Sequence, residues 1–111
     1  MKQWEIWEFP FPSAADPHMF VILSPTRLCA DANFDSVNGL LCTTVRPLGR
    51  AAKPHEVFLD TADGLDWLTA VRCNVIFHFA KAAAGARRGA VSVVRRRELT
   101  RKIHASLELP A

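Results

Sequence analysis

The sequence contains no long apolar run. Its longest run is Met19 to Leu23, far short of the roughly 20 apolar residues that a membrane-spanning helix needs. Glu5 and Glu8 interrupt the apolar N-terminal stretch, which excludes the hydrophobic segment of an export signal. We therefore expect no membrane segment and a protein that stays in the cytoplasm.

Cysteine is scarce, and its spacing forms no motif. Cys29, Cys42 and Cys73 lie far apart, with no CxxC pair and no nearby pair of histidines, so neither a disulfide framework nor a structural zinc site is indicated. We expect buried, reduced thiols, with a reactive thiol or an incidental surface thiol as the alternatives. A Gly-rich phosphate loop, HExxH and GxSxG are also absent, so we expect no metal and no cofactor.

Acidic residues are rare in the second half of the chain. Residues 67–111 contain nine basic side chains and only Glu98 and Glu108 as acids, whereas residues 1–66 contain five basic and nine acidic side chains. A basic half can collect a polyanion such as RNA, because phosphate neutralisation releases counterions. It can equally dock an acidic protein segment, or simply be a solvated, Arg-rich helix face.

What the chain does contain predicts a small, mainly β domain spanning residues 1–111. Half of the residues are apolar, and a chain of this length is typical of one domain. Short apolar segments separated by turn residues predict antiparallel strands over 4–9, 19–24, 40–45, 55–59, 70–73 and 76–79. Residues 26–38 read as irregular or as a short helical turn, 60–64 as a turn, and 82–89 as small and flexible.

One helix is expected near the C-terminus. Ser92 is a plausible N-cap for a helix from about Val93 to Leu107. Within it, apolar residues recur every four positions and form one stripe that can pack on the sheet. The stripe consists of Leu99, Ile103 and Leu107.

Five short blocks stand in a particular order along the chain. They are Glu5-Ile6-Trp7 with Phe11, Met19 to Pro25, Leu41-Cys42-Thr43-Thr44, Val71-Arg72-Cys73-Asn74, and Gly89 to Leu109. In order and spacing they resemble the MazF, PemK and Kid toxins of bacterial toxin–antitoxin systems, over nearly the whole chain. Each block alone is short, so the resemblance rests on all five together.

This resemblance implies a fold, an activity and partners. The fold is a small SH3-like antiparallel β-barrel with a C-terminal amphipathic α-helix, usually a homodimer. The activity is metal-independent, sequence-selective cleavage of single-stranded RNA, silenced by a cognate antitoxin. In such cleavage a base removes the proton of a ribose 2′-hydroxyl, the oxygen attacks the adjacent phosphorus, and an acid protonates the departing 5′-oxygen.

The resemblance also implies site residues. Arg72 matches the catalytic arginine of the Kid branch, and Thr43 matches the threonine that contacts the scissile region. Asn74 stands where the family has its aspartate base, and a carboxamide cannot take up a proton near neutral pH. His18 stands where the family has an arginine, and its imidazole is suited to act as the base instead. We expect RNA contacts from Thr44, Asn74, Arg46, Arg50 and Lys53.

Each candidate also has a plain structural interpretation. His18 can be a surface residue at a strand start, Thr43 a β-favouring strand residue, and Arg72 an ion-pair partner for an acid such as Asp66. The first loop, Pro12 to Pro17, is shorter than the family's and lacks its Gly, Glu and Gln residues.

Three functions follow from the sequence. The first is an endoribonuclease toxin that uses Arg72 and Thr43, with His18 or a displaced acid as the base. The second is a barrel that has lost cleavage and binds RNA or an antitoxin-like peptide, which Asn74 and the short first loop favour. The third is a gyrase poison like CcdB, which shares the fold. It is disfavoured because CcdB ends in Trp-Gly-Ile and this chain ends Leu109-Pro110-Ala111.

Overall fold

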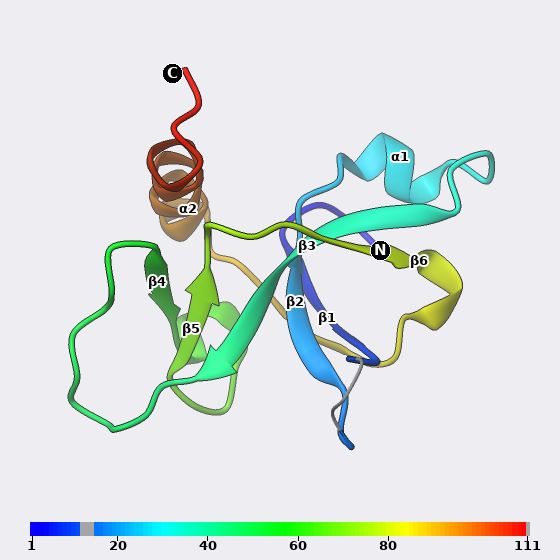
Figure 1. Cartoon of the computed structure of the whole chain (residues 1–111). Helices are drawn as coiled ribbons and strands as arrows, with labels where there is room; N and C mark the ends of the chain where they lie inside the picture. Colours follow the sequence, from blue (N-terminus) through cyan, green and yellow to red (C-terminus); the bar gives the residue numbers. More distant parts are fainter. Residues whose placement is uncertain (12–14, 111) are drawn as a thin grey trace.

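The computed structural model describes residues 1–11 and 15–110. Pro12 to Ala14, on which part of the short-loop prediction rests, and Ala111 of the C-terminal comparison lie outside the described residues. Seven antiparallel strands form one curled sheet in the order β4-β5-β3-β2-β1-β7, and β6 pairs with β3 off this path (Figure 1). The strands are β1 (Glu5–Phe9), β2 (His18–Ile22), β3 (Ser36–Thr44), β4 (Glu56–Leu59), β5 (Thr69–Arg72), β6 (Phe77–Ala80) and β7 (Arg87–Ala90).

The helical segments lie between and after these strands. They are α1 (Thr26–Ala30), α2 (Val93–Ser106) and the short 3₁₀ segments η1 (Thr61–Asp63) and η2 (Lys81–Ala83). None of the helices in the described part of the chain is long and apolar enough to cross a membrane.

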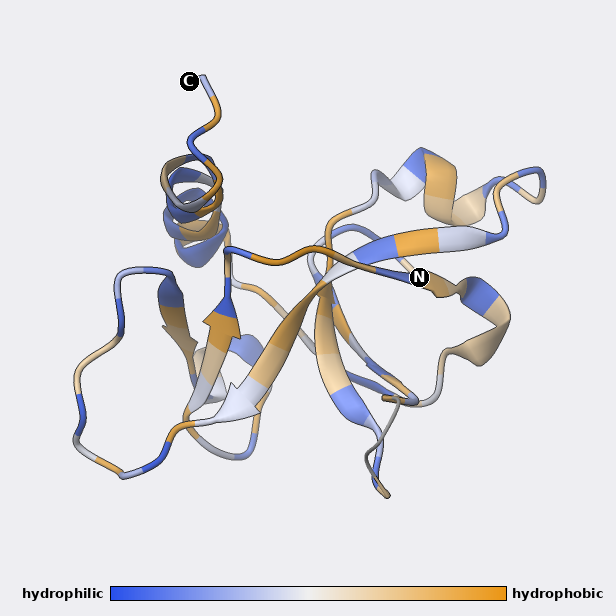
Figure 2. Cartoon of the chain, in the orientation of Figure 1, coloured by the Kyte–Doolittle hydropathy of each residue, from blue (hydrophilic) through white to orange (hydrophobic). Residues whose placement is uncertain are grey.

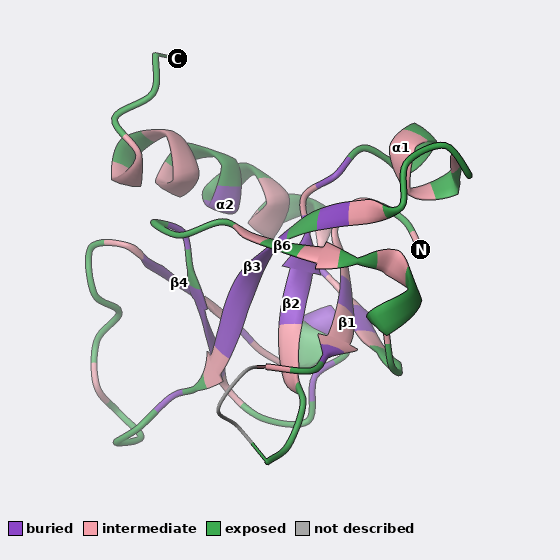
Figure 3. Cartoon of the chain, turned by 45° about the vertical axis from the view of Figure 1, so that its right-hand side comes forward, coloured by how far each residue is buried: buried purple, intermediate pink, exposed green. Residues whose placement is uncertain are grey.

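Strand β2 lies at the centre of the sheet and is strongly apolar. Phe20, Val21 and Ile22 of β2 are fully buried, as expected for a strand with neighbours on both sides (Figures 2 and 3). The sequence pattern predicted a strand that starts at Leu40, but β3 begins at Ser36. The extra residues form a strand because they pair with β6, a long-range contact that leaves no periodic trace in the local sequence.

Each face of the sheet carries its own apolar cluster. On one face Leu40, Val57 and Val71 pack with Leu99 of α2. On the other face an aromatic cluster surrounds Phe20, whose ring centre lies 4.5 Å from that of Phe79. This second face lies away from α2, and Phe77 and Phe79 of β6 pack against its cluster.

Helix α2 is anchored at its start by buried charge. Ser92 flanks the helix as predicted, but its side chain caps nothing. Instead the carboxylate of Asp63, whose side chain is fully buried, accepts a hydrogen bond from the Ser92 backbone N–H at 2.9 Å and from Arg95 at 2.7 Å. Arg95 also donates to Asp60 at 2.9 Å. Arg95 is therefore an anchor of the helix and not part of its solvated face.

Residues 82–89 were expected to be flexible, and this prediction is wrong for residues 87–89. These three residues belong to β7, which pairs with β1. Gly89 lets β7 pass close to η1, because a Cβ atom there would collide with the carbonyl oxygen of Asp63. A glycine at this position therefore reflects a close approach of two backbone segments.

The cysteines are reduced, as predicted. Cys42 and Cys73 are buried and free, and Cys29 is half-buried and free. Burial raises the pKa of the Cys42 and Cys73 thiols to about 12, which keeps them protonated and unreactive near neutral pH.

Candidate functional site

A groove of about 470 Å³ lies at one end of the sheet, where β2 begins and β3 ends. His18 is the first residue of β2, and Thr43 and Thr44 are the last two residues of β3. All three line this groove. The fold thus brings together two of the three predicted catalytic residues, His18 and Thr43, and one of the predicted RNA contacts, Thr44.

The sheet register explains why these residues meet. Met19 pairs with Cys42, so the next pair along the two antiparallel strands is His18 with Thr43. Paired residues project from the same face of a sheet, and side chains alternate along each strand. His18 and Thr43 therefore project from the face that lies away from α2.

The His18 ring packs against Phe11, with ring centres 4.9 Å apart. Its Nδ1 atom is buried and has no hydrogen-bond partner among the described residues. A histidine that acts as a base through one ring nitrogen keeps its proton on the other, which is usually hydrogen-bonded to an acceptor. No described side chain supplies that acceptor at Nδ1 of His18.

Arg72 lies on the same face of the sheet as Thr43 but outside the groove. Thr43 pairs with Ala70, and Arg72 follows two residues later. Thr69 of β5 pairs with Thr44 of the groove. Arg72 lies three residues further along β5, so its backbone is on the order of 10 Å from that of Thr69. Arg72 is exposed and makes no ion pair with any described acid, so its guanidinium is available to an anion.

The predicted cations of the loop between β3 and β4 differ in their surroundings. Arg50 makes two hydrogen bonds to Glu56, at 2.7 and 3.1 Å, and lies 5.3 Å from the ring centre of Phe58. These hydrogen bonds lower the pKa of the buried Glu56 carboxyl to about 2. Arg46 and Lys53 are exposed. Arg50 thus holds the loop on β4, whereas Arg46 and Lys53 present their charges to solvent.

Asn74 is exposed and lines a separate depression with His55 and with Ala105 and Ser106 of α2. Glu56 pairs with Arg72 across β4 and β5, so the loop that ends at Glu56 brings Lys53 to the Arg72 end of the sheet. The predicted residues therefore divide into a groove group and an Arg72 group at the opposite end of β5.

Among the groove residues that sequence reasoning missed, three form one group: Glu8, Trp67 and Arg88. Glu8 of β1 accepts a hydrogen bond from Arg88 of β7 at 2.9 Å, and Arg88 lies 6.0 Å from the ring centre of Trp67. Asp66 lies 3.6 Å from Arg88, which corrects the alternative in which Asp66 would pair with Arg72. Neighbouring residues in the sequence could not indicate this group, because its members come from three distant segments.

No set of three or more His, Cys, Asp or Glu side chains in residues 1–11 and 15–110 is arranged to hold a metal ion. The groove is lined by hydroxyls, an imidazole, an indole, the carboxylates of Glu8 and Asp16, and the Arg88 guanidinium, which is paired with Glu8. These groups can exchange hydrogen bonds with polar ligands and can contact flat rings.

No family model matches the sequence, and no curated protein matches it either. Solved structures do match. An endoribonuclease from a mycobacterial species, in complex with its cognate antitoxin, shares 17% identity and a TM-score of 0.82, covering 100% of this chain and 98% of that one. The Mycobacterium tuberculosis toxin MazF-mt6 shares 17% identity and a TM-score of 0.79, covering 96% of this chain and 99% of that one. The chain has the fold of the MazF-type toxins.

The MazF-type fold confirms the predicted class, a mainly β structure with a C-terminal helix, here a curled antiparallel half-barrel. A second endoribonuclease from a mycobacterial species has a TM-score of 0.80 at 17% identity and covers 100% of this chain and 94% of its own. The fold match is thus end to end, although few residues are identical.

Proposed function

We propose that this chain is an endoribonuclease toxin that cleaves single-stranded RNA and is silenced by a cognate antitoxin. The observation that carries the proposal is the groove of the MazF-type fold in which His18 and Thr43 meet. The exposed Arg72 on the same sheet face and the basic second half of the chain support it further.

The proposed reaction needs no metal. A base removes the proton of the ribose 2′-hydroxyl, and the O2′ atom forms a bond to the adjacent phosphorus. The bond from phosphorus to the 5′-oxygen breaks, and that oxygen leaves with a proton from an acid. The products are a 2′,3′-cyclic phosphate and a 5′-hydroxyl end.

We assign roles to three side chains. The His18 imidazole takes up the proton of the 2′-hydroxyl, and the Thr43 hydroxyl orients the scissile region beside it. Arg72 binds a phosphate of the same strand, because its planar guanidinium can donate two parallel hydrogen bonds to phosphate oxygens. The RNA then extends from the groove toward Arg72 and Lys53, at the other end of β5. A homodimer is part of the proposal, as the resemblance implies.

The first test is incubation of the purified protein with a long single-stranded RNA in EDTA. EDTA removes the action of contaminating metal-dependent nucleases. We expect cuts that end in 2′,3′-cyclic phosphate, and we expect Arg72→Ala, which removes a phosphate contact outside the groove, to slow them clearly while circular dichroism shows an intact fold. Arg97→Ala is the matched control, since Arg97 is an exposed arginine on α2. Equal cleavage by Arg72→Ala and the wild type contradicts the assigned site.

His18→Asn tests the proton exchange. Asparagine has no group that can take up the proton of the 2′-hydroxyl, so we expect the variant to lose cleavage at neutral pH. The measurement is the cleavage rate from about pH 5 to 8. A wild-type pH profile that persists in His18→Asn excludes His18 as the base.

Asn74 favours one second candidate, a barrel that binds RNA or an antitoxin-like peptide without cleaving it. An asparagine stands at the position of the family's aspartate, and its side chain is exposed at the surface. Binding of RNA by the folded wild type, with no cleavage and no growth arrest on expression, decides for this candidate.

A further inference from the structure

Trp67 is a large aromatic side chain that the fold leaves accessible. It is 45% exposed and lines the groove beside His18 and Thr43. Burying an indole is strongly favourable, so an accessible tryptophan in a groove is more informative than a scattered surface valine or leucine. The other two tryptophans, Trp4 and Trp7, pack against the two apolar clusters.

The position of Trp67 is fixed by its neighbours. The Thr69 hydroxyl donates a hydrogen bond to the Trp67 carbonyl at 3.0 Å, and Thr69 pairs with Thr44 of the groove. The Arg88 guanidinium lies 6.0 Å from the indole ring centre, and Glu8 and Asp66 hold it there. An indole beside an arginine of this kind resembles the stacking surfaces on which proteins bind unpaired bases.

The charge beside Trp67 favours a base over a phosphate at that side chain. Glu8 neutralises Arg88, and Asp16 adds an exposed carboxylate to the lining with no ion pair among the described residues. Carboxylates repel phosphate but accept hydrogen bonds from the amino and imino groups of bases. Free positive charge for the phosphates lies elsewhere, at Arg72 and Lys53.

We propose that Trp67 is a specificity-determining residue of the groove, on which one unpaired nucleobase of the RNA stacks next to His18 and Thr43. This inference rests on the proposed function for the class of ligand, a single-stranded RNA. It adds the place where a base binds and the side chain that binds it. Glu8 and Asp16 then select among bases through the donors that each base presents.

The test uses single-stranded oligonucleotides with 2′-O-methyl groups, which cannot form the cyclic phosphate and so report binding alone. A set in which one base at a time is replaced by an abasic site is bound to the wild type, Trp67→Ala and Trp67→Phe, with fluorescence anisotropy as the readout. Val94→Ala is the control, because Val94 is 79% exposed and does not line the groove. Thermal unfolding confirms that each variant folds.

We expect Trp67→Ala to weaken binding by about 5- to 100-fold, the usual range for one stacked base, and Trp67→Phe to retain most of the affinity. One abasic position should weaken binding to the wild type and have no further effect on Trp67→Ala, because the same contact is already missing. Val94→Ala should bind as the wild type does.

Unchanged affinity of Trp67→Ala, or an abasic penalty that persists in it, overturns the inference. It is also overturned if the wild type binds none of these oligonucleotides, or if an antitoxin-like peptide and not RNA loses affinity in Trp67→Ala. The proposed function fails separately: a wild type that binds RNA through Trp67 but never cleaves refutes the endoribonuclease and leaves the stacking site. Cleavage that is equal in the wild type and Trp67→Ala, in rate and in cut sites, refutes only the stacking site.

Discussion

At the scale of single residues, buried charge organises the surface near Arg72. Glu56 is 4% exposed, receives two hydrogen bonds from Arg50 and one from the Lys53 backbone N–H at 2.9 Å, and lies opposite Arg72 in the sheet. One buried carboxylate thus ties the loop between β3 and β4 to the sheet. A carboxylate with a pKa of about 2 is also a very weak base. Glu56 is therefore not a suitable replacement for the aspartate base that the resemblance would place at position 74.

We predict that Glu56→Gln destabilises the fold in a pH-dependent way. The folded-state pKa lies below the ordinary value of 4.5, so the carboxylate stabilises the fold fully above about pH 5, and this stabilisation is lost as the pH falls toward 2. Urea unfolding should show a loss of about 1–3 kcal/mol at pH 7 and about half of that at pH 3.

The matched control for this prediction is Glu98→Gln, which changes an exposed glutamate of α2. We expect it to stay within about 0.5 kcal/mol of the wild type at both pH values. A loss for Glu56→Gln that is the same at pH 7 and pH 3 would show that packing, and not charge, is what Glu56 contributes.

At the scale of elements, the attachment of α2 depends on residues far from the helix. Leu99 is its one fully buried side chain, and Ile103 is only partly buried against the same cluster. The start of the helix is also attached by polar contacts to η1. There the Asp63 carboxylate accepts hydrogen bonds from the Ser92 backbone N–H and from the Arg95 guanidinium. A negative charge at this end of the helix also complements the positive end of its dipole.

We predict that Asp63→Ala detaches the start of α2 and lowers the free energy of unfolding by about 2–4 kcal/mol. The variant leaves Arg95 without one of its two carboxylates and the Ser92 and Asp60 amides without acceptors, and unpaired buried groups of this kind are costly. Chemical denaturation measures the loss. Asp66→Ala, which removes an exposed acid 3.6 Å from Arg88, should cost less than about 1 kcal/mol, and equal losses for the two variants would refute the anchoring role.

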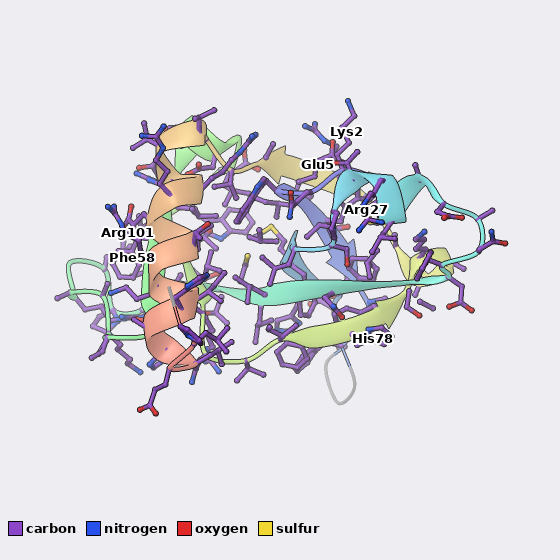
Figure 4. All side chains as sticks on the ribbon, turned by 90° about the horizontal axis from the view of Figure 1, so that it is seen from above. Lys2, Glu5, Arg27, Phe58, His78 and Arg101 are labelled. Carbon is purple, nitrogen blue, oxygen red and sulfur yellow. The ribbon has the colours of Figure 1, made fainter. Side chains whose placement is uncertain are left out.

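At the scale of the whole molecule, positive charge has two separate locations. Arg97 and Arg101 are exposed on α2, which covers one face of the sheet, and Figure 4 shows Arg101 on the outer side of that helix. Arg72 projects from the other face, since its neighbour Val71 packs on the α2 side. Net charge alone therefore does not say which surface an RNA would meet.

We predict that the affinity for RNA depends on the positive charges near Arg72 and not on those of α2. The affinity for a non-cleavable single strand should fall steeply with salt, and removing both Arg72 and Lys53 should reduce the slope of log K against log salt by about 1.4, or about 0.7 for each phosphate contact. The charge-matched variant lacking Arg97 and Arg101 should keep the wild-type slope. Equal reductions in the two variants would mean that the field of the whole protein, and not the Arg72 surface, attracts the RNA.

The sequence by itself determined the class of fold and most of its elements. Apolar segments between turn residues predicted β1, β2, β4, β5, β6 and α2 to within about two residues, because side-chain periodicity and turn chemistry are local properties. Local pattern also indicated His18 and Thr43, through a resemblance to blocks that each lie within one strand.

Only the tertiary structure decided how these pieces meet. Antiparallel pairing brought His18 and Thr43 together and moved Arg72 to the opposite end of β5. Pairing with β6 lengthened β3, and pairing with β1 made a strand of residues that look flexible in the sequence. The groove around Trp67 and the anchor of α2 both join segments that lie far apart in the chain. Their contacts depend on strand register and burial, which no local pattern encodes.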